Sequence, residues 1–332
     1  MRILIWVLVL GAIGWSGYWY VASSGAGRGL EAWLDARAAE GWQAEGTVET
    51  TGFPTTFDTA ITDIALADPE TGLAWSAPEL RLTAQAWAPT SVKARLPGTQ
   101  TVSTPYERIE IESDEILASL SLEPGADLTL IASEITMRSV VLASSADWTA
   151  ALKSGVLGSQ RAGSEALAHD IKFETRDFKP SGSILLNLDP TGTLPDVFEE
   201  LTVRARITFD APWDRRAIED RRPQITYVDL SGIRARWGQM EFQAAGEVAV
   251  DGNGVPDGRI TVRAVNWREM LAIGEAAGFV PEALAPTIER GLEVLAGLRG
   301  NPETIDAPLS FQDGFVSFGP IPLGPAPNLT IR

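Results

Sequence analysis

The chain has 332 residues, and a hydrophobic share of 45% is enough to fill one large core or two ordinary ones. Its 27 Lys and Arg residues are outnumbered by 44 Asp and Glu residues, and the net charge of -17 argues against a nucleic-acid-binding protein, which needs a basic surface. The sequence has no cysteine and a single histidine, which excludes disulfides, cysteine nucleophiles and multi-histidine metal sites.

The first feature along the chain is an uncharged apolar segment at residues 3–22, which as a helix would be about 30 Å long. This length matches the hydrocarbon core of a bilayer. Arg2 precedes the segment and Arg28 follows it at a distance, so the positive-inside rule predicts a cytoplasmic N-terminus. We therefore expect residues 1–24 to be a single-pass anchor in a bacterial inner membrane, with the main domain in the periplasm.

Aromatic rings near both ends of this segment favour a retained anchor, because such rings prefer the membrane interface. The rings expected at the interface are Trp6, Trp15, Tyr18 and Trp19. The alternative is a cleaved signal peptide, for which Ser24 and Ala26 supply small residues at suitable positions. The apolar run is longer than the ~7–15 residues usual in a signal peptide, which favours the anchor.

Residues 25–44 are expected to form a linker followed by a short amphipathic helix. The glycine-rich stretch at 25–29 predicts a flexible hinge. Apolar residues then recur at helical spacing over residues 30–38, and Gly41 supplies a stop signal. A stripe this narrow more often covers the end of a sheet than lies on a membrane, so we expect it to pack against the sheet.

From Thr47 onward the dominant pattern alternates apolar and polar residues, which predicts strands with one buried face. Strands are expected at 92–96, 109–112, 184–188, 203–209, 233–237, 260–264, 309–311 and 315–318. Turn sequences that would join antiparallel neighbours occur at 68–72, 123–127 and 251–254. Helical spacing interrupts the strands at 147–157, 213–221, 266–278 and 281–298.

These patterns predict a β-rich α+β protein, with a single N-terminal transmembrane helix followed by a large, mostly antiparallel sheet and a few peripheral helices. Residues 45–332 would form this periplasmic β-rich domain, with room for two sub-lobes that meet near 158–200. The sheet could be curved and open, form a β-groove or close into a sandwich, and the sequence leaves these alternatives open.

Two segments resemble a known family. Residues 52–54 with 66–78 resemble the opening of an uncharacterised domain-of-unknown-function family of alphaproteobacterial envelope proteins. Residues 313–323, with the sequence DGFVSFGPIPL, resemble the terminal signature of the same family. The likeness covers about 42–327 and implies an envelope protein, but it carries no site residues.

The strands between Leu230 and Ala264, with the hairpin sequence DGNGVPDG at 251–258, more distantly resemble AsmA-like proteins. That resemblance implies one helical anchor and a long β-groove of the kind implicated in lipid traffic. It is a likeness of architecture, and a function inferred from it is an analogy.

The candidate binding residues lie in the expected strands at 203–209 and 233–237 and in the segment around Phe242. One face would carry apolar side chains that form either an ordinary core or a groove for a lipid acyl chain: Val203, Ile207, Phe209, Ile233, Trp237 and Phe242. The other face would carry four arginines able to contact lipid head groups or acidic partners: Arg204, Arg206, Arg234 and Arg236. An ordinary solvated sheet face is the alternative for the arginines.

No catalytic site, metal site or cofactor is expected. His169 is the only histidine and has no nucleophile-elbow sequence near it, so we assign it a structural or surface role. The segment that begins at Asp251 only superficially resembles a calcium loop, because Val255 and Val262 stand where ligands are required. Adjacent carboxylates such as those at 199–200 would point to opposite sides of a strand.

We therefore expect a non-enzymatic, membrane-anchored envelope protein that binds or shuttles lipid along an apolar β-groove. The alternative is a periplasmic scaffold or protein-interaction module that has no lipid ligand. A hydrolase would need paired carboxylates at a spacing that we cannot locate in the sequence. The expected partners are the inner membrane, a phospholipid or another lipid, and envelope proteins, but not nucleic acid.

Overall fold

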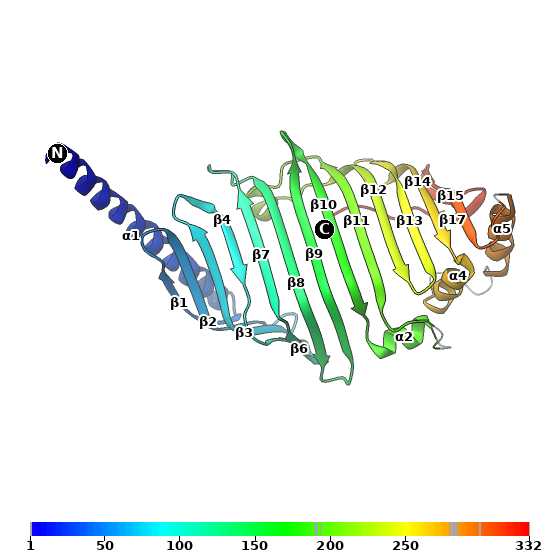
Figure 1. Cartoon of the computed structure of the whole chain (residues 1–332), viewed down its shortest axis with the longest axis horizontal. Helices are drawn as coiled ribbons and strands as arrows, with labels where there is room; N and C mark the ends of the chain where they lie inside the picture. The colour runs from blue at the N-terminus through cyan, green and yellow to red at the C-terminus, as the bar shows by residue number, and fades with distance from the viewer. Residues whose placement is uncertain are drawn as a thin grey trace. The chain divides into compact units, whose positions relative to one another are not determined.

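The computed structural model describes residues 2–189, 192, 194–278, 280, 285–298 and 300–331. The chain divides into two compact units. Figure 1 traces its helices and strands from the N-terminus in blue to the C-terminus in red. Unit 1 comprises the residues up to Leu122 and Thr136–Asp147, and unit 2 comprises Glu123–Ile135 and the residues from Trp148 onward. We predicted two sub-lobes that meet near 158–200. The division between the two units falls instead between residues 122 and 148. Residues 158–162 and 165–179 belong to two long strands of unit 2.

Unit 1 contains one long helix and a branched antiparallel sheet. Its elements are α1 (Arg2–Ala39), β1 (Gln43–Thr51), β2 (Thr56–Asp68), β3 (Leu73–Gln85), β4 (Ala88–Arg95), β5 (Gln100–Ser103), β6 (Arg108–Glu112), β7 (Glu115–Leu122) and the larger part of β8 (Leu130–Ser144). The strands β1, β2 and β3 pair in chain order. Residues 81–85 of β3 then pair with β4, and residues 74–76 pair with β5, so the sheet branches at β3.

Helix α1 runs without interruption from Arg2 to Ala39, so the predicted hinge at 25–29 is wrong. Glycine in a helix interior costs about 1 kcal/mol relative to alanine, and packing against the sheet offsets this cost. Leu34 is buried, and Leu30 packs against a buried apolar cluster on β2 and β3. Of the stripe predicted at residues 30–38, Leu30 and Leu34 therefore cover the sheet, whereas Trp33 and Ala38 are exposed.

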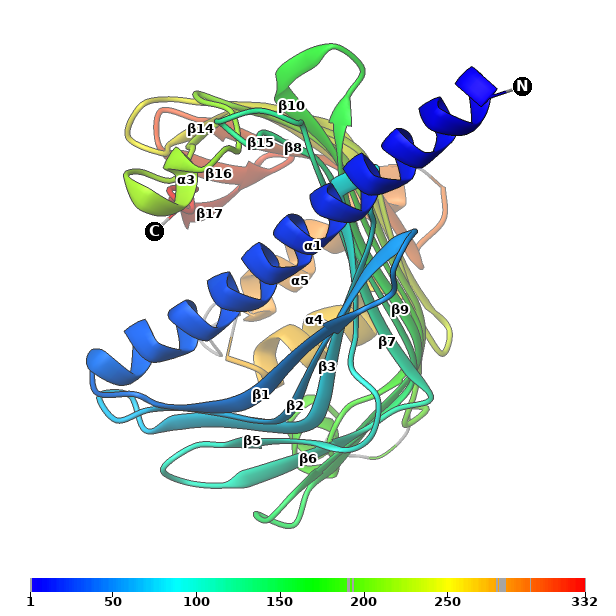
Figure 2. The ribbon, with the colours of Figure 1, turned by 90° about the vertical axis from the view of Figure 1, so that its left-hand side faces the viewer.

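Aromatic side chains in the middle of α1 attach the helix to the ends of two hairpins of unit 1. Figure 2 shows the ribbon of α1 leading into β1 of the same unit. Their ring N–H and hydroxyl groups donate hydrogen bonds to backbone carbonyls at 2.8 to 2.9 Å: Trp15 to Pro54, Tyr18 to Ala86 and Trp19 to Thr56. The sequence predicted these rings at a membrane interface and did not predict their contacts with the sheet. The helix is long and apolar enough to cross a membrane, and Trp6 is exposed.

In the described residues, unit 2 consists of nine strands that follow one another in chain order, four helices and the start of β8. Each of the nine strands is antiparallel to the next. The strands are β9 (Thr149–Ala162), β10 (Glu165–Lys179), β11 (Phe198–Phe209), β12 (Ile225–Trp237), β13 (Met240–Val250), β14 (Pro256–Val265), β15 (Thr304–Gln312), β16 (Phe315–Phe318) and β17 (Ile321–Pro325). The helices are α2 (Gly182–Leu188), α3 (Arg216–Glu219), α4 (Trp267–Ala276) and α5 (Ala285–Leu298).

The predicted class, a β-rich and mostly antiparallel chain with few helices, is confirmed. The expected strands at 92–96, 109–112, 203–209, 233–237, 260–264, 309–311 and 315–318 correspond to β4, β6, β11, β12, β14, β15 and β16. The helices expected at 266–278 and 281–298 are α4 and α5, and residues 281–284 lie outside the described residues. Of the helix expected at 213–221, the structure has only the short α3.

Two elements were assigned to the wrong class. Residues 147–157, predicted as a helix, belong mostly to β9, which pairs with β10 along its length; sheet pairing here overrides a helical spacing of apolar residues. Residues 184–188, predicted as a strand, lie in α2. Ser181 caps this helix, because its Oγ accepts a hydrogen bond from the backbone N–H of Ile184 at 3.4 Å.

Candidate functional site

An apolar cavity of about 380 Å³ in unit 2 is bounded by helices α4 and α5 and by strands β13 to β17. All fourteen described residues that line it are apolar. In α4 the lining residues Trp267, Met270 and Leu271 follow helical spacing, and in α5 Ile288 and Leu292 do the same. Each helix therefore turns one apolar stripe toward the sheet. A volume of about 300–1,000 Å³ is typical of small-molecule sites.

Specific contacts hold the two helices over the sheet. Trp267 is only 2% exposed, and its Nε1–H donates a hydrogen bond to the carbonyl oxygen of Pro302 at 2.9 Å. The guanidinium of Arg268 covers the same ring, 4.5 Å from its centroid. In α5 a Cβ at Gly291 would lie 2.7 Å from Cδ1 of Ile321, so glycine allows β17 to approach the helix closely. These contacts make the cavity a fixed part of the fold.

The cavity adjoins a row of apolar side chains that crosses seven strands of unit 2. Residues paired directly across neighbouring strands share a face of the sheet. The pairs form one line from β9 to β15: Leu157, Phe173, Val203, Ile233, Ala244, Val262 and Ala307. Val262 lines the cavity, whereas Leu157 at the other end of the row is 45% exposed.

Four of the six predicted apolar residues lie together on this face. Val203, Ile207, Ile233 and Phe242 all pack against one buried cluster of β11 to β14, and Phe242 also lines the cavity. Leu309 and Phe318 contact the same cluster and line the cavity as well. The apolar surface is therefore continuous from β11 to the cavity.

The other two predicted residues occupy packed positions. Phe209 is 6% exposed, and its ring meets that of Trp213 edge to face at 5.5 Å. Trp237 is 5% exposed, stacks on Phe198 at 4.1 Å and donates a hydrogen bond to the carbonyl oxygen of Pro195 at 2.6 Å. Both side chains belong to the packed interior, so of the two alternatives left open by the sequence these residues fit the ordinary core and not the open groove.

Sequence reasoning missed the cavity residues on α4 and α5. The two helices were predicted, and the helical spacing of their apolar residues indicates that one face of each is buried. Which strands that face would cover depends on long-range packing, and the period of a helix carries no information about it. The residues missed on the two helices are Trp267, Met270, Leu271, Ile288 and Leu292.

The four predicted arginines alternate with the apolar residues of β11 and β12, so they lie on the opposite face of the sheet. Arg206 binds the carboxylate of Asp170 through two hydrogen bonds of 2.7 and 3.1 Å. The hydrogen bond from Arg206 lowers the pKa of Asp170, so this carboxyl remains ionised at neutral pH. Arg236 lies opposite Glu200 and Glu241 in the sheet register.

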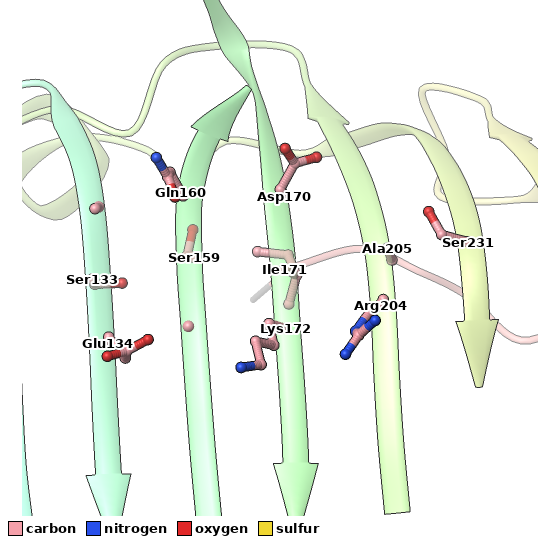
Figure 3. Close-up of a pocket in the computed structure, with 12 residues that line it drawn as sticks. Ser133, Glu134, Ser159, Gln160, Asp170, Ile171, Lys172, Arg204, Ala205 and Ser231 are labelled. Carbon is pink, nitrogen blue, oxygen red and sulfur yellow. The ribbon is translucent and has the colours of Figure 1, made fainter. Parts of the chain in front are cut away.

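A hollow of about 360 Å³ with a mixed polar and apolar lining lies on unit 2 beside Arg204 (Figure 3). In the register of β9 to β11, Gly158 is opposite Lys172, which is opposite Arg204, and the missing side chain of the glycine leaves space beside the two cations. Glu174 binds both of them, with oxygens 2.8 Å from Arg204 and 3.3 Å from Lys172. The hydrogen bond from Arg204 is the main cause that lowers the pKa of Glu174.

Protein carboxylates therefore already match much of the positive charge on this face. Arg234 differs from its neighbours, because the residues opposite it are Thr202 and Gln243, neither of which is acidic. Exposed ion pairs contribute only about 0–1 kcal/mol each, so a lipid phosphate could still replace them. A head-group role for these arginines stays a prediction.

A metal site and the single histidine are the remaining candidates for a functional site. Among the described residues, no group of three or more His, Asp or Glu side chains is placed to hold a metal ion. His169 is buried and 1% exposed, its Nδ1 lies 3.0 Å from Oγ of Ser159, and its Nε2 has no hydrogen-bond partner in the described part of the chain. Burial, followed by the positive charge of Arg161, lowers the pKa of His169. It is a neutral core residue.

The burial of His169 predicts a specific pH dependence of stability. Because its pKa is lowered in the folded state, the unfolded chain binds more protons below pH about 6.5, so the free energy of unfolding falls as the pH drops below that value. The loss should not exceed about 1.4 kcal/mol per pH unit. Urea unfolding between pH 7.5 and 5.5 measures it.

The control variant is His169→Leu, which removes the only histidine of the sequence. Carboxyl groups titrate mainly below this range, so the variant should show a nearly flat profile between pH 7.5 and 5.5. Equal slopes for the two proteins would contradict the assignment of a neutral, buried His169.

A comparison with known families matches residues 19–327 to the family described as "Uncharacterized protein conserved in bacteria (DUF2125)". The match covers most of the chain and includes both segments that carried the family resemblance. The alphaproteobacterial source and the AsmA-like resemblance stay predictions. No curated protein and no solved structure matches the chain.

Proposed function

The chain belongs to this uncharacterised bacterial family, and we propose that it is a non-enzymatic, membrane-anchored envelope protein that binds lipid acyl chains. The bound chain would occupy the cavity between α4, α5 and the sheet of unit 2. The observation that carries this proposal is the continuity of the cavity with the apolar face of β11 to β14. Such a surface could pass an acyl chain along the sheet, as in a β-groove.

The energetics of apolar burial support an acyl chain as the ligand. Each buried methylene contributes about 0.8 kcal/mol, so ten methylenes would contribute about 8 kcal/mol before the cost of association. That gross value corresponds to a dissociation constant of about 1 μM, and the cost of association makes the actual binding weaker, as suits a carrier that must also release its lipid. Leu323 lines the cavity and is 49% exposed, which gives a chain a route of entry.

The helix α1 supports a location at the membrane. It is long and apolar enough to cross a bilayer, and the charge distribution around its apolar segment favours the inner membrane with both units in the periplasm. Arg234 and its neighbours lie on the face of the sheet opposite the cavity, so they would contact the phosphate of another lipid molecule than the one bound there. The AsmA-like resemblance of 230–264 agrees with lipid traffic, as an analogy of architecture.

Photo-crosslinking of the full chain tests the proposal. The protein is placed in phospholipid nanodiscs that contain a phospholipid with a diazirine on its acyl chain, and crosslinked peptides are mapped by mass spectrometry. We expect labelled residues in the cavity, such as Met270, Ile288 and Leu309, because an acyl chain in the cavity would contact them.

Labelling of the apolar part of α1 serves as the internal positive control of this experiment. Labels confined to α1 would contradict lipid binding by unit 2. A stoichiometric protein crosslinked in place of lipid would favour the alternative, an envelope scaffold without a lipid ligand.

A further inference from the structure

We propose that the ends of two hairpins of unit 1 form a second membrane contact beside α1. These ends are the β1–β2 turn at 52–55 and the β3–β4 turn at 86–87, and the surface they enter is the polar–apolar interface of the bilayer that α1 crosses. The inference goes beyond the proposed lipid-binding function. It depends on α1 as an anchor and not on the cavity of unit 2.

Each of the two turns exposes a large aromatic side chain. Phe53 is 55% exposed and Trp87 is 64% exposed. No charged residue occurs in 50–57 or in 82–92, although 21% of the chain is charged. Uncharged, aromatic turns of this kind are typical of segments that lie at a membrane interface.

Hydrogen bonds from within unit 1 pair several backbone groups of these turns. The N–H groups of Thr55 and Thr56 donate to the carbonyl oxygen of Gly52, and the N–H of Ala86 donates to that of Thr55. The carbonyls of Pro54, Thr56 and Ala86 accept hydrogen bonds from side chains of α1. An unsatisfied backbone group costs several kcal/mol in an apolar medium, so this pairing lowers the penalty for entering the interface.

The same hydrogen bonds fix the depth of the turns. The apolar run of α1 ends near Ala22, and at 1.5 Å per residue Trp19 lies about 5 Å and Trp15 about 10 Å before that end. The β1–β2 turn is bonded to both rings, so it lies level with the last part of the apolar run. Tyr18 lies between these rings and binds the carbonyl of Ala86 in the β3–β4 turn. If α1 spans a bilayer, both turns therefore lie about 5–10 Å inside the end of the apolar run, at the outer edge of the hydrocarbon core.

Single cysteine variants test the contact in the full chain, because the sequence contains no cysteine of its own. Phe53→Cys and Trp87→Cys are labelled with an environment-sensitive fluorophore and reconstituted in phosphatidylcholine vesicles with brominated acyl chains. We expect a blue-shifted emission for both labels and a loss of intensity by quenching from the brominated lipid.

Two further variants serve as references. Gly11→Cys lies in the apolar run of α1 with open space around it, and it should be quenched strongly if the helix crosses the bilayer. Tyr106→Cys replaces a residue that is 94% exposed in the β5–β6 turn, at the opposite end of β3, and its label should be neither shifted nor quenched.

The inference is overturned if the labels at 53 and 87 behave like the label at 106 while that at 11 is quenched. It is also overturned if the label at 11 is not quenched, since the anchor then fails. Neither outcome depends on lipid in the cavity of unit 2, so this test and the crosslinking test can fail separately.

Discussion

Replacing Gly246 by alanine is expected to destabilise unit 2 by about 3–5 kcal/mol, through backbone strain and overpacking together. Gly246 has φ +154°, and a Cβ there would clash with the carbonyl oxygen of Arg259 and lie 2.7 Å from Cα of Ile260. Both are backbone atoms of the neighbouring strand β14, so no side-chain rotation relieves the clash. A loss of this size is a large share of the about 5–15 kcal/mol that stabilises a typical domain.

The matched control is Gly232→Ala in the adjacent strand β12, where an added Cβ would meet no atom within 4 Å. This change should alter the free energy of unfolding by less than about 1 kcal/mol, because alanine at a compatible position costs little or stabilises slightly. Urea unfolding of the full chain, followed by near-ultraviolet circular dichroism, compares the variants. Equal midpoints for Gly246→Ala and Gly232→Ala would show that β13 and β14 do not approach so closely.

The strands of unit 2 could be predicted from the sequence because their two faces meet different environments. In 203–207 the apolar residues belong to or pack against the cluster of β11 to β14, and the arginines between them face outward, so the alternation of apolar and polar residues reflects which side chains are buried. Residues 147–157 were wrongly predicted as a helix, because the spacing of their apolar residues fits one. In the structure most of them form β9, which pairs with β10. Local spacing cannot report a partner that is distant in the sequence.

The candidate site was only partly predictable for the same reason. The face shared by Val203, Ile207, Ile233 and Phe242 follows from strand periodicity alone, and the structure brings these residues together. Trp237 has the same periodicity, yet Phe198 and the carbonyl of Pro195 enclose it. Whether an apolar position is filled or open depends on which distant segment covers it.

A similar limit applies to α1. The composition of residues 3–22 predicted a membrane-spanning length, but the acceptors of Trp15 and Trp19 are 39 and 37 residues away in the chain. Nothing in the helix identifies them, so the sequence assigned these rings to the lipid interface. The structure adds a second role, in which the same rings bind the sheet of unit 1.

Replacing Ile288 by tryptophan should block the cavity and reduce acyl-chain crosslinking of unit 2 at least about tenfold. Ile288 is partly buried on the face of α5 that lines the cavity, so the larger ring extends into existing space. If the ring displaces two methylenes of the bound chain, about 1.6 kcal/mol of apolar burial is lost, and 1.4 kcal/mol already corresponds to a tenfold change in affinity. The measurement is the yield of cavity peptides crosslinked to the diazirine phospholipid.

The matched control is Val294→Trp, which makes a comparable change on the same helix at a residue that is 64% exposed. It should leave the crosslinking of unit 2 unchanged, and labelling of α1 should be equal in both variants, since the anchor is unaffected. Because the ring at 288 fills space and does not replace packed atoms, the free energy of unfolding should not fall as it does in an overpacked core. Undiminished crosslinking in a folded Ile288→Trp protein would place the acyl chain elsewhere, whereas a selective loss would identify the space between α4, α5 and the sheet as the lipid site.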